Sequence, residues 1–479
     1  MRKILTFIAA ILIAGNLLAG GLVTNTNQSA MFTRLQNRNA STGIDAVYYN
    51  PAGLTRLGDG LYVSINNQTI GQTKTVGNNY PYLNGKPVDY VGKVSAPIYP
   101  GVYVAFKTGK LAFSAGFNPI GGGGGAKYDK GLPSFEMGIS DLVPGLNGQL
   151  TPLAGSIPNV NTIAGYQADI YFEGTSVYFG YQANVSYAIT EALSFALGGR
   201  MVLAKNTYNG YIRNTKILAP ASYGGLQSPG TYLRFVAGLV PEPTKSTLNG
   251  TATAIDGKTS VEADVEQTGS GYTPIISLNF SPSDKLNLAM KYEFKTKLEL
   301  TTSVKDGKNA GGMFTDGGKT IADMPAMLSF GAEYKATEKL MVTASMNTYF
   351  DKNVDYDGSA TLDIPMIKKN FLEYGLGAEY SLSEKLRASA GWVATSTGVN
   401  SDYQNDQRYS TNTNSFGAGF GYRITSMIDL NIGGQYTMYK EGSKNITHLL
   451  GTTSVPGITE TYNKKTMIFA IGLDFTFGK

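Results

Sequence analysis

The side chains that could do chemistry are few in this chain, and their types exclude most classes of enzyme. The 479 residues include no Cys and one His, His448. Without Cys there are no disulfides, thiolate nucleophiles or Cys-based metal sites, and a lone His cannot build a multi-His zinc site. A hydrolase would need His448 beside a Ser and a carboxylate or amide, but this residue lies in an apolar stretch, 446–450. We therefore expect no catalytic residues, no cofactor and no metal.

Two polar motifs resemble ligand sites but lack essential positions. The acidic run at 351–358 alternates like a calcium loop, yet an EF-hand requires Gly at its sixth position, which is Tyr356 here. A polar extracellular turn explains the run better. The glycine run at 121–125 is not a phosphate cradle, because Lys127 is followed by Tyr128 rather than by Ser or Thr.

The composition favours strands and turns over helices. Charged residues make up 16% of the chain, against about 25% in soluble globular domains. The chain holds 31 Tyr, which strands favour, and 59 Gly, which turns favour. The formal net charge of +5 is close to neutral for this length, so we expect no nucleic-acid partner.

The first 20 residues have the pattern of a secretory signal peptide. Arg2 and Lys3 form a basic start, residues 4–14 are almost wholly apolar, and small residues follow near 19–21. The apolar run is too short to span a bilayer, and no other run approaches about 18 apolar residues. We therefore expect cleavage near residue 20 and no helical membrane span.

Many segments alternate between apolar and polar side chains with a period of two. In residues 286–300, Leu286, Leu288 and Met290 fall on one face, and Lys291 and Glu293 on the other. Extended structure separates them this cleanly, because successive side chains of a strand point to opposite faces. The pattern predicts 14 strands, at residues 61–65, 102–106, 111–117, 177–189, 193–203, 276–280, 286–300, 328–334, 340–350, 372–382, 386–394, 416–424, 428–438 and 467–477.

The connections between these strands alternate between short and long. Short ones lie near residues 108–110 and 383–385, whereas long ones span 119–170 and 213–259. Tight turns at one end and long loops at the other are typical of an outer-membrane β-barrel, which must close because lipid satisfies no backbone hydrogen bonds. A soluble secreted β-sandwich or solenoid also alternates, but it does not explain the sustained short–long rhythm. The predicted fold class is therefore all-β, a 14-stranded antiparallel transmembrane β-barrel.

The segment before the first strand, residues 21–60, lacks this alternation. A barrel of this size has a lumen too wide for its own side chains to fill, so an N-terminal segment could plug it. Pro51 fixes its own φ and biases Asn50 to an extended conformation, which makes a firm turn within the segment. We predict a signal peptide at 1–20, an N-terminal hatch (a plug inside the lumen) at 21–60 and the barrel at 61–479.

Residues 50–54, Asn-Pro-Ala-Gly-Leu, resemble a motif of the FadL-type long-chain fatty-acid transporters of Gram-negative outer membranes. Residues 41–46, 118–121 and 323–325 are similar to further segments of that family. The resemblance implies a plugged 14-stranded barrel and the passive uptake of hydrophobic compounds. It also implies capture of the cargo by apolar extracellular loops and lateral release through a gap near the third strand. The hatch motif consists of Asn50, Pro51, Ala52 and Gly53.

The end of the third strand is the predicted lateral gate. Pro119 cannot donate to a strand ladder, and the glycines that follow have no side chains to pack. Both features would loosen the wall at this point, although a flexible loop stem has the same composition. The predicted gate residues are Asn118, Pro119, Gly121, Gly122 and Gly123.

Apolar and cationic side chains are the candidates for binding the cargo. Residues 132–150 and 217–240 place apolar groups on exposed loops, which is costly unless these groups pack on each other or bind something. A fatty-acid carboxylate would need a lumen-facing cation, although most such charges solvate or pair with nearby Glu. The predicted ligand-binding residues are Leu22, Val23, Phe32, Phe135, Ile139, Leu142, Arg200, Lys291 and Lys295.

Two functions remain open. The hatch and the apolar loops favour passive transport of hydrophobic compounds, above all long-chain fatty acids, whereas the charged face at 291–299 favours a general porin for small polar solutes. A plugged barrel should carry little ion current, so single-channel conductance separates them. The resemblance implies a monomer in the outer membrane of a Gram-negative bacterium, in contact with outer-membrane lipid, lipopolysaccharide and a hydrophobic small-molecule ligand.

Overall fold

The wall of the molecule is a closed barrel of 14 antiparallel strands. The computed structural model describes residues 25–85, 87–354 and 366–478. The barrel closes because the first strand, β1, pairs with β2 on one side and with the last strand, β18, on the other. The predicted fold class and strand number are confirmed. The wall is built from β1 (Gly60–Asn78), β2 (Val88–Thr108), β3 (Leu111–Tyr128), β4 (Tyr166–Ala188), β5 (Leu193–Leu218), β7 (Val261–Ser283), β8 (Leu286–Glu293), β9 (Glu299–Asn309), β10 (Lys319–Ile321), β11 (Met327–Lys335), β12 (Leu340–Tyr349), β13 (Phe371–Ser381), β14 (Leu386–Ser396), β15 (Thr413–Thr425), β16 (Ile428–Tyr439) and β18 (Thr453–Gly478).

Two of the wall strands are interrupted. β8 and β9 both pair with β7 on one side, and on the other side β8 pairs with β11 and β9 with β10. β8 and β9 therefore form one wall strand, and β10 and β11 form the next. Pro325 between β10 and β11 cannot donate a ladder hydrogen bond, which explains the second break. The short strands β6 (Leu226–Gln227) and β17 (Gly442–Leu450) are hairpin partners of β5 and β18 and are not part of the count.

The wall presents apolar side chains to lipid and small or polar ones to the lumen. On β18, Met467 and Phe469 are exposed, while Ala470 beside them is buried. The outward face becomes polar beyond Met467, where Lys465 is exposed. Residues 453–465 of β18 therefore lie on the extracellular side of the apolar band that contacts lipid.

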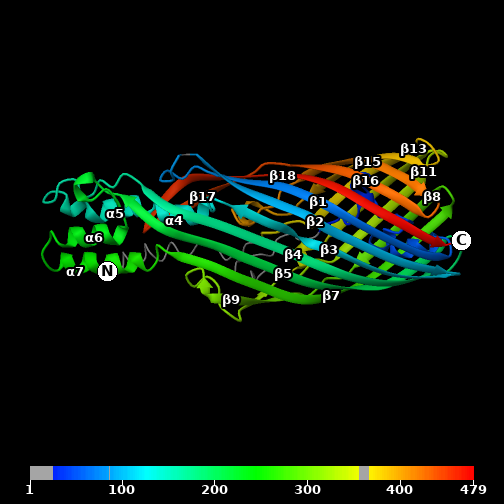
Figure 1. Ribbon diagram of the computed structural model, residues 1–479, viewed down its shortest axis with the longest axis horizontal. Coiled ribbons are helices and arrows are strands. Elements are labelled where there is room, and N and C mark those ends of the chain that lie inside the picture. The colour runs from blue at the N-terminus through cyan, green and yellow to red at the C-terminus, as the bar shows by residue number, and fades with distance from the viewer. Residues whose placement is uncertain (1–24, 86, 355–365, 479) are drawn as a thin grey trace.

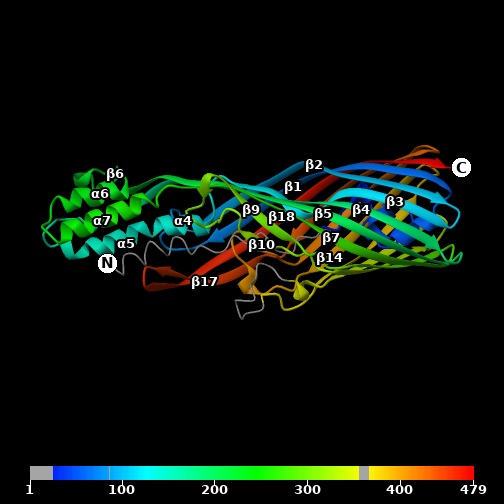
Figure 2. The same ribbon diagram turned by 90° about the horizontal axis from the view of Figure 1, so that it is seen from below.

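The helices of the β3–β4 and β5–β7 loops lie at the end of the molecule opposite the C-terminus, where β4, β5, β7 and the β17–β18 hairpin extend beyond most of the other strands (Figure 1, Figure 2). The loops predicted at 119–170 and 213–259 are therefore shorter than expected, because β3 runs to Tyr128 and β5 to Leu218. Apolar side chains of these loop helices share one buried core, which stabilises the extension. The helices are α4 (Pro133–Ser140), α5 (Leu142–Leu150), α6 (Pro229–Ala237) and α7 (Thr244–Asp256), with 3₁₀ turns at η2 (Thr151–Leu153), η3 (Ala221–Tyr223), η4 (Asp351–Asn353) and η6 (Ser401–Tyr403).

The described part of the hatch, from residue 25 to the start of β1, lies inside the barrel (Figure 1). Its helix α2 (Ala30–Arg34) packs against β15, β16 and β18, and its 3₁₀ turn η1 (Pro51–Arg56) packs against β4, β5 and β7. A short helix, α3 (Ala46–Tyr49), lies between them. The predicted signal peptide at 1–20 and part of the acidic run, 355–358, lie outside the described residues. Among the described helices, none has the length and apolar character needed to cross a membrane.

Candidate functional site

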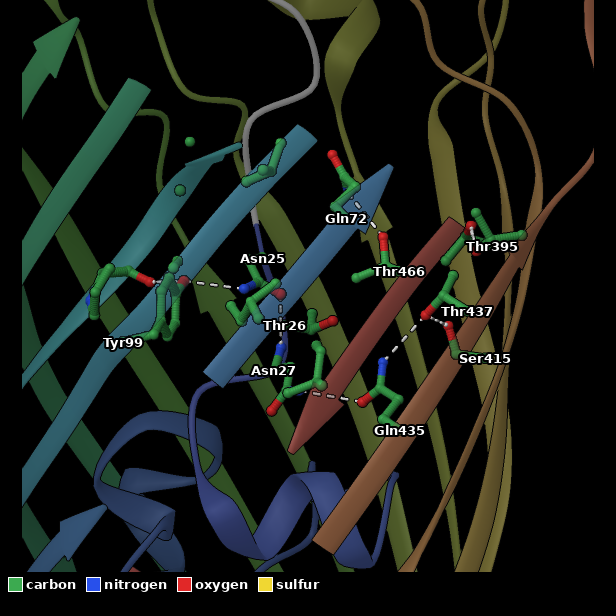
Figure 3. A pocket seen from close by; sticks show the side chains of 18 of the residues that line it. Asn25, Thr26, Asn27, Gln72, Tyr99, Thr395, Ser415, Gln435, Thr437 and Thr466 are labelled. Carbon is green, nitrogen blue, oxygen red and sulfur yellow. Dashed lines mark hydrogen bonds between the residues drawn. The ribbon is translucent and has the colours of Figure 1, made fainter. Parts of the chain in front are cut away.

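A cavity of about 420 Å³ lies in the lumen between the hatch and the wall (Figure 3). This volume falls within the range of roughly 300–1,000 Å³ that is typical of small-molecule sites. One side of the cavity is polar, with Thr395, Thr413, Ser415 and Thr437 on β14, β15 and β16. Its apolar lining consists of Phe32, Ile70, Val94, Ala96, Ile98, Val177, Phe179, Phe371, Val393 and Ile468.

The first described residues of the hatch form the floor of this cavity. The backbone N–H of Asn25 donates to the carbonyl O of Ile120 (3.1 Å), and its side-chain Nδ2 donates to Tyr99 Oη (3.0 Å). Asn27 Nδ2 donates to Gln435 Oε1 of β16 (3.1 Å) (Figure 3). The hatch therefore bridges β2 and β3 on one side and β16 on the other.

The wall beside this floor has a gap in its hydrogen bonding. β2 pairs with β3 up to Val94 and again from Val102, and the intervening residues of β2 have no partner on β3. The matching stretch of β3 lies between Phe117 and Ala126 and contains Pro119, which has no N–H to donate. At the point where the hatch reaches it, the wall is therefore not closed by backbone hydrogen bonds between β2 and β3.

The glycines after Pro119 shape the same gap. The pairing of β3 with β4 changes register between Pro119 and Gly121 and again between Gly121 and Gly124. Gly122 has φ +91°, and a Cβ there would lie 2.2 Å from the carbonyl O of Ser176, so only glycine fits. Ile98, in the stretch of β2 that has no partner on β3, is 74% exposed and lines the same cavity as residues of the hatch. The cavity therefore extends from the lumen into the wall.

The structure brings the predicted gate residues together at this gap. Pro119, Gly121 and Gly122 line the cavity, and Gly123 belongs to the stretch of β3 that is unpaired with β2. Asn118 is buried beside them, and its Nδ2 donates to Gln28 Oε1 of the hatch (2.7 Å). The predicted gate and the hatch thus form one hydrogen-bonded unit.

The hatch motif holds the other end of the hatch. Asn50 Nδ2 donates to a backbone carbonyl of the hatch (3.0 Å) and to Asn279 Oδ1 on β7 (2.7 Å). The carbonyl oxygens of Pro51 and Ala52 accept hydrogen bonds from serines of β4 and β5 (2.7 and 2.9 Å). A Cβ on Gly53 would lie 2.4 Å from Asn50 Nδ2, so the close approach needs glycine. The motif anchors the hatch and does not line the cavity.

The three predicted cationic ligands are all paired with carboxylates. Arg200 Nη1 lies 2.6 Å and Lys291 Nζ 2.7 Å from the Glu293 carboxylate, and the three side chains are buried. Lys295 Nζ lies 3.0 Å from Asp323. None of these three cations belongs to the cavity lining among the described residues, so their role as ligands stays a prediction.

The predicted apolar ligands lie in different places. Phe32 lines the cavity, whereas Phe135 lies beside a smaller apolar cavity of about 70 Å³ between the start of α4 and the extended ends of β4, β5 and β7. Ile139 and Leu142 are buried in the core that the loop helices share, which is the packing alternative foreseen for them. Leu22 and Val23 lie outside the described residues.

The sequence reasoning did not identify the polar side of the cavity or its lysine, Lys464. The polar side chains occupy alternate, inward positions of their strands, and Ser415 lies opposite Thr437 in the β15–β16 pairing. An inward face rich in Ser and Thr on neighbouring strands could have indicated this lining. The pattern does not reveal how far the hatch reaches up the lumen, and the hatch decides which inward residues stay open.

Comparisons with known proteins agree with this geometry. The family described as outer membrane protein transport protein (OMPP1/FadL/TodX) matches residues 163–477. No curated protein matches the chain. A Pseudomonas aeruginosa FadL homologue shares the fold with a TM-score of 0.63 at 14% identity, over 96% of this chain and 99% of its own. The P. putida toluene transporter TodX gives 0.53 at 15% identity (92% and 95% covered), and the Ralstonia pickettii toluene transporter TbuX 0.52 at 17% (91% and 94%).

Proposed function

We propose that this chain, which belongs to the outer membrane transport protein family (OMPP1/FadL/TodX), carries long-chain fatty acids passively across the outer membrane. The family consists of outer-membrane transporters of hydrophobic compounds rather than enzymes. The proposal includes the division into a signal peptide (1–20), a hatch (21–60) and a barrel (61–479). It also includes a monomeric state and contact with lipopolysaccharide of a Gram-negative cell.

One observation carries the proposal: the lumenal cavity and the gap in the wall are continuous. Residues of the hatch and the exposed Ile98 of β2 line the same space. An alkyl chain in the cavity could therefore reach the lipid without passing through the hatch. Because apolar groups gain about 25 cal/mol per Å² on leaving water, an alkyl cargo would move sideways into the bilayer rather than into the aqueous periplasm.

The proposed route begins at the extracellular loops. Phe135 and its small apolar cavity would receive the cargo, and Phe32 at the base of the lumenal cavity would contact it next. The cargo would then leave between β2 and β3, at Asn118, Pro119 and the glycines that follow. The hydrogen bonds of Asn25 to Tyr99 and Ile120 span this exit, so we propose that the N-terminal end of the hatch moves aside during release.

A bulky side chain in the gap tests lateral release. Ala96 lines the cavity, whereas its neighbour Ser95 is exposed and does not line it. In cells that lack their own fatty-acid carrier, Ala96→Trp should reduce uptake of radiolabelled oleate by at least about tenfold, because the indole would fill the exit. Ser95→Trp, with the same added volume on the opposite face, should leave uptake nearly unchanged. Equal uptake by both variants, at equal barrel levels, would contradict lateral release.

The porin alternative rests on the charged residues of 291–299. Lys291 and Glu293 are buried in an ion cluster with Arg200, so these charges hold structure together instead of lining an open channel. In a planar bilayer we expect the plugged barrel to conduct ions weakly. A steady, large conductance from the unmodified protein would favour the porin.

A further inference from the structure

Two lysines face each other at the extracellular end of the lumen. Lys74 of β1 is directly opposite Lys464 of β18 in the strand pairing. Both lie at inward positions, in line with the buried residues Val76 and Tyr462, and Lys464 lines the lumenal cavity. Like charges directly opposite each other on neighbouring strands destabilise a sheet. The arrangement is therefore a cost to the empty protein.

No acidic partner offsets this cost within the described residues. Neither Lys74 nor Lys464 has an ion pair or a side-chain hydrogen bond to another described residue. The cations deeper in the lumen behave differently, since Arg200 and Lys291 share Glu293. Lys464 is instead bordered by aromatic rings, with its Nζ 5.0 Å from the ring centre of Tyr409 and 5.2 Å from that of Tyr439.

Three elements of the described structure contribute groups that surround Lys464. β1 contributes Lys74, the loop before β15 contributes Tyr409, and β16 contributes Tyr439. Burial raises the pKa of both tyrosines, so the phenols stay neutral at physiological pH. Burial, reinforced by repulsion from Lys74, lowers the pKa of Lys464 to about 7, and burial lowers the pKa of Lys74 to about 8.

We propose that Lys464, with Lys74 opposite it, is a carboxylate-binding subsite at the extracellular end of the cavity, so that the cargo is an alkyl carboxylate rather than an uncharged hydrocarbon. The proposal rests on the proposed function and names the residues that would hold the carboxylate of the fatty acid. A carboxylate would supply the missing counter-charge and accept hydrogen bonds from the ammonium group. The alkyl chain would then extend along Ile468 and Val393 toward Phe32 and the gap.

The charges of the cavity favour one orientation of such a cargo. The two acidic residues among its lining, Asp351 and Glu373, lie on the β12–β13 side, away from β18. Glu373 accepts hydrogen bonds from Thr26 and Asn347 and is committed to holding the hatch. A carboxylate is therefore repelled from that side and attracted to Lys464. An uncharged hydrocarbon would make no use of this asymmetry.

Binding of matched probes to the purified full-length protein in a non-ionic detergent tests the proposal. Tritiated dodecanoate and dodecanol have the same alkyl chain and differ in the carboxylate. Lys464→Gln should weaken dodecanoate binding by about tenfold or more, since it removes a charge-assisted hydrogen bond, and leave dodecanol binding within about twofold. Lys465→Gln is the matched control, because Lys465 is the next residue of β18 and is exposed on the outer face.

Two further measurements separate binding from folding. Because Lys464→Gln removes an uncompensated repulsion, it should unfold at a temperature no lower than that of the unmodified protein. Because a bound carboxylate favours the protonated lysine, dodecanoate should bind more tightly as the pH falls from 9 to 6.5 and should take up protons at pH 7.5 in calorimetry in two buffers. Lys464→Gln should lose this proton uptake.

The outcomes distinguish the two proposals. If dodecanoate and dodecanol bind equally and Lys464→Gln changes neither, the carboxylate subsite is wrong while the transport of alkyl compounds stands. If Lys465→Gln weakens dodecanoate as much as Lys464→Gln, the effect is one of general charge and the subsite is again overturned. If neither alkyl probe binds the unmodified protein, the proposed function fails, and the subsite fails with it.

Discussion

Cations are paired with carboxylates in the lower part of the lumen, which the hatch fills, whereas two lysines face each other in the upper part, above the hatch. Around the hatch, cations meet carboxylates: Arg38 Nε lies 2.8 Å from Asp45, and Arg200 Nη1 lies 2.6 Å from Glu293. Above the hatch, Lys464 of the cavity faces another lysine. Buried charges cost several kcal/mol each unless they are paired, so the paired set can hold the hatch whereas the unpaired set is left available for a ligand.

The backbone hydrogen bonding also differs between two sectors of the wall. From β12 to β16 the pairing between neighbouring strands is continuous over the part of the wall that the hatch contacts. Between β2 and β3 it lapses from Val94 to Val102. The wall from β12 to β16, which includes two of the strands that α2 packs on, is therefore sealed, and the opening lies beyond β18 and β1, between β2 and β3. Variants that affect one part and spare the other can test this comparison.

The largest expected effect comes from removing a paired cation of the hatch. Arg34 is fully buried, contacts Glu379, and donates to Asn431 Oδ1 (2.8 Å) and Ser389 Oγ (2.9 Å). Arg34→Ala leaves Glu379 buried without its partner, a loss of about 3–5 kcal/mol in typical cases. We expect the hatch to loosen and the ion conductance in a planar bilayer to rise clearly.

Arg423→Ala is the control for this variant. Its Nε lies 3.6 Å from Asp429, its side chain is 52% exposed, and pairs of this kind contribute little. We expect its conductance to equal that of the unmodified protein. Similar conductance from Arg34→Ala would show that paired charges do not hold the hatch.

A glycine next to the hatch should give the next largest effect. A Cβ on Gly433 would lie 2.6 Å from the backbone N of Arg34, whereas one on Gly434 would have its nearest neighbour at 3.9 Å. Gly433→Ala therefore forces α2 away from β16, at a cost of about 1–3 kcal/mol. We expect a lower thermal unfolding midpoint by circular dichroism for Gly433→Ala and little change for Gly434→Ala. Equal midpoints would mean that the hatch does not press on this strand.

These glycines show what the sequence could and could not predict. Alternation identified 14 strands, because lipid on one side and the lumen on the other impose different side chains on the two faces. The segment 416–424 was predicted as a strand, and its glycines at 417, 419 and 421 are two residues apart and share one face. That those glycines leave room for the hatch backbone follows only from the fold, since the hatch lies hundreds of residues away in the chain.

The strand ends were harder to predict than the strands. Residues 205–216 of β5 are mostly polar on both faces, because this part of the strand lies beyond the apolar band, and the strand predicted from alternation therefore ended at 203. The cations of the site raised a similar difficulty. Alternation placed Lys291 on the inward face, but its partner atoms come partly from the hatch, with Nζ donating to the carbonyl O of Tyr48 (2.8 Å). A sequence pattern predicts on which face of a strand a side chain lies, but it does not determine which atoms that side chain contacts.

The extracellular loops contain a paired charge of their own, which extends the comparison above the membrane. Asp141, between α4 and α5, lies 2.6 Å from His448 Nε2 on β17 and accepts a hydrogen bond from Tyr80 Oη in the β1–β2 loop. Asp141→Ala should cost about 1–2 kcal/mol, because it leaves two largely buried polar groups without this partner. We expect faster amide hydrogen exchange in residues 80–83 and 446–458.

Asp256→Ala provides the reference for the loop variant. Asp256 on α7 pairs with Arg234 on α6 at 2.6 Å, and both side chains are partly exposed, so the loss of this pair should change amide hydrogen exchange little. Unchanged exchange in Asp141→Ala would show that apolar packing alone joins the three loops.

The smallest effect concerns Glu460, a carboxyl that accepts hydrogen bonds from Asn78 and Tyr462 but has no ion pair within the described part of the chain. Glu460 lies above the apolar band, and burial, followed by repulsion from Asp406, raises its pKa to about 7. An acid whose pKa is raised on folding binds more protons when folded, so its contribution to stability is present at low pH and is lost as the pH rises from about 4.5 to about 7. Glu460→Gln should therefore stabilise the protein at pH 8 by on the order of 1 kcal/mol and change little at pH 4.5. Glu293→Gln removes the charge of a carboxylate that has ion-pair partners, so it should destabilise the protein at pH 8. Thermal unfolding of both variants at the two pH values would show whether their changes in stability have opposite signs. The contrast between paired and unpaired charges requires opposite signs at pH 8.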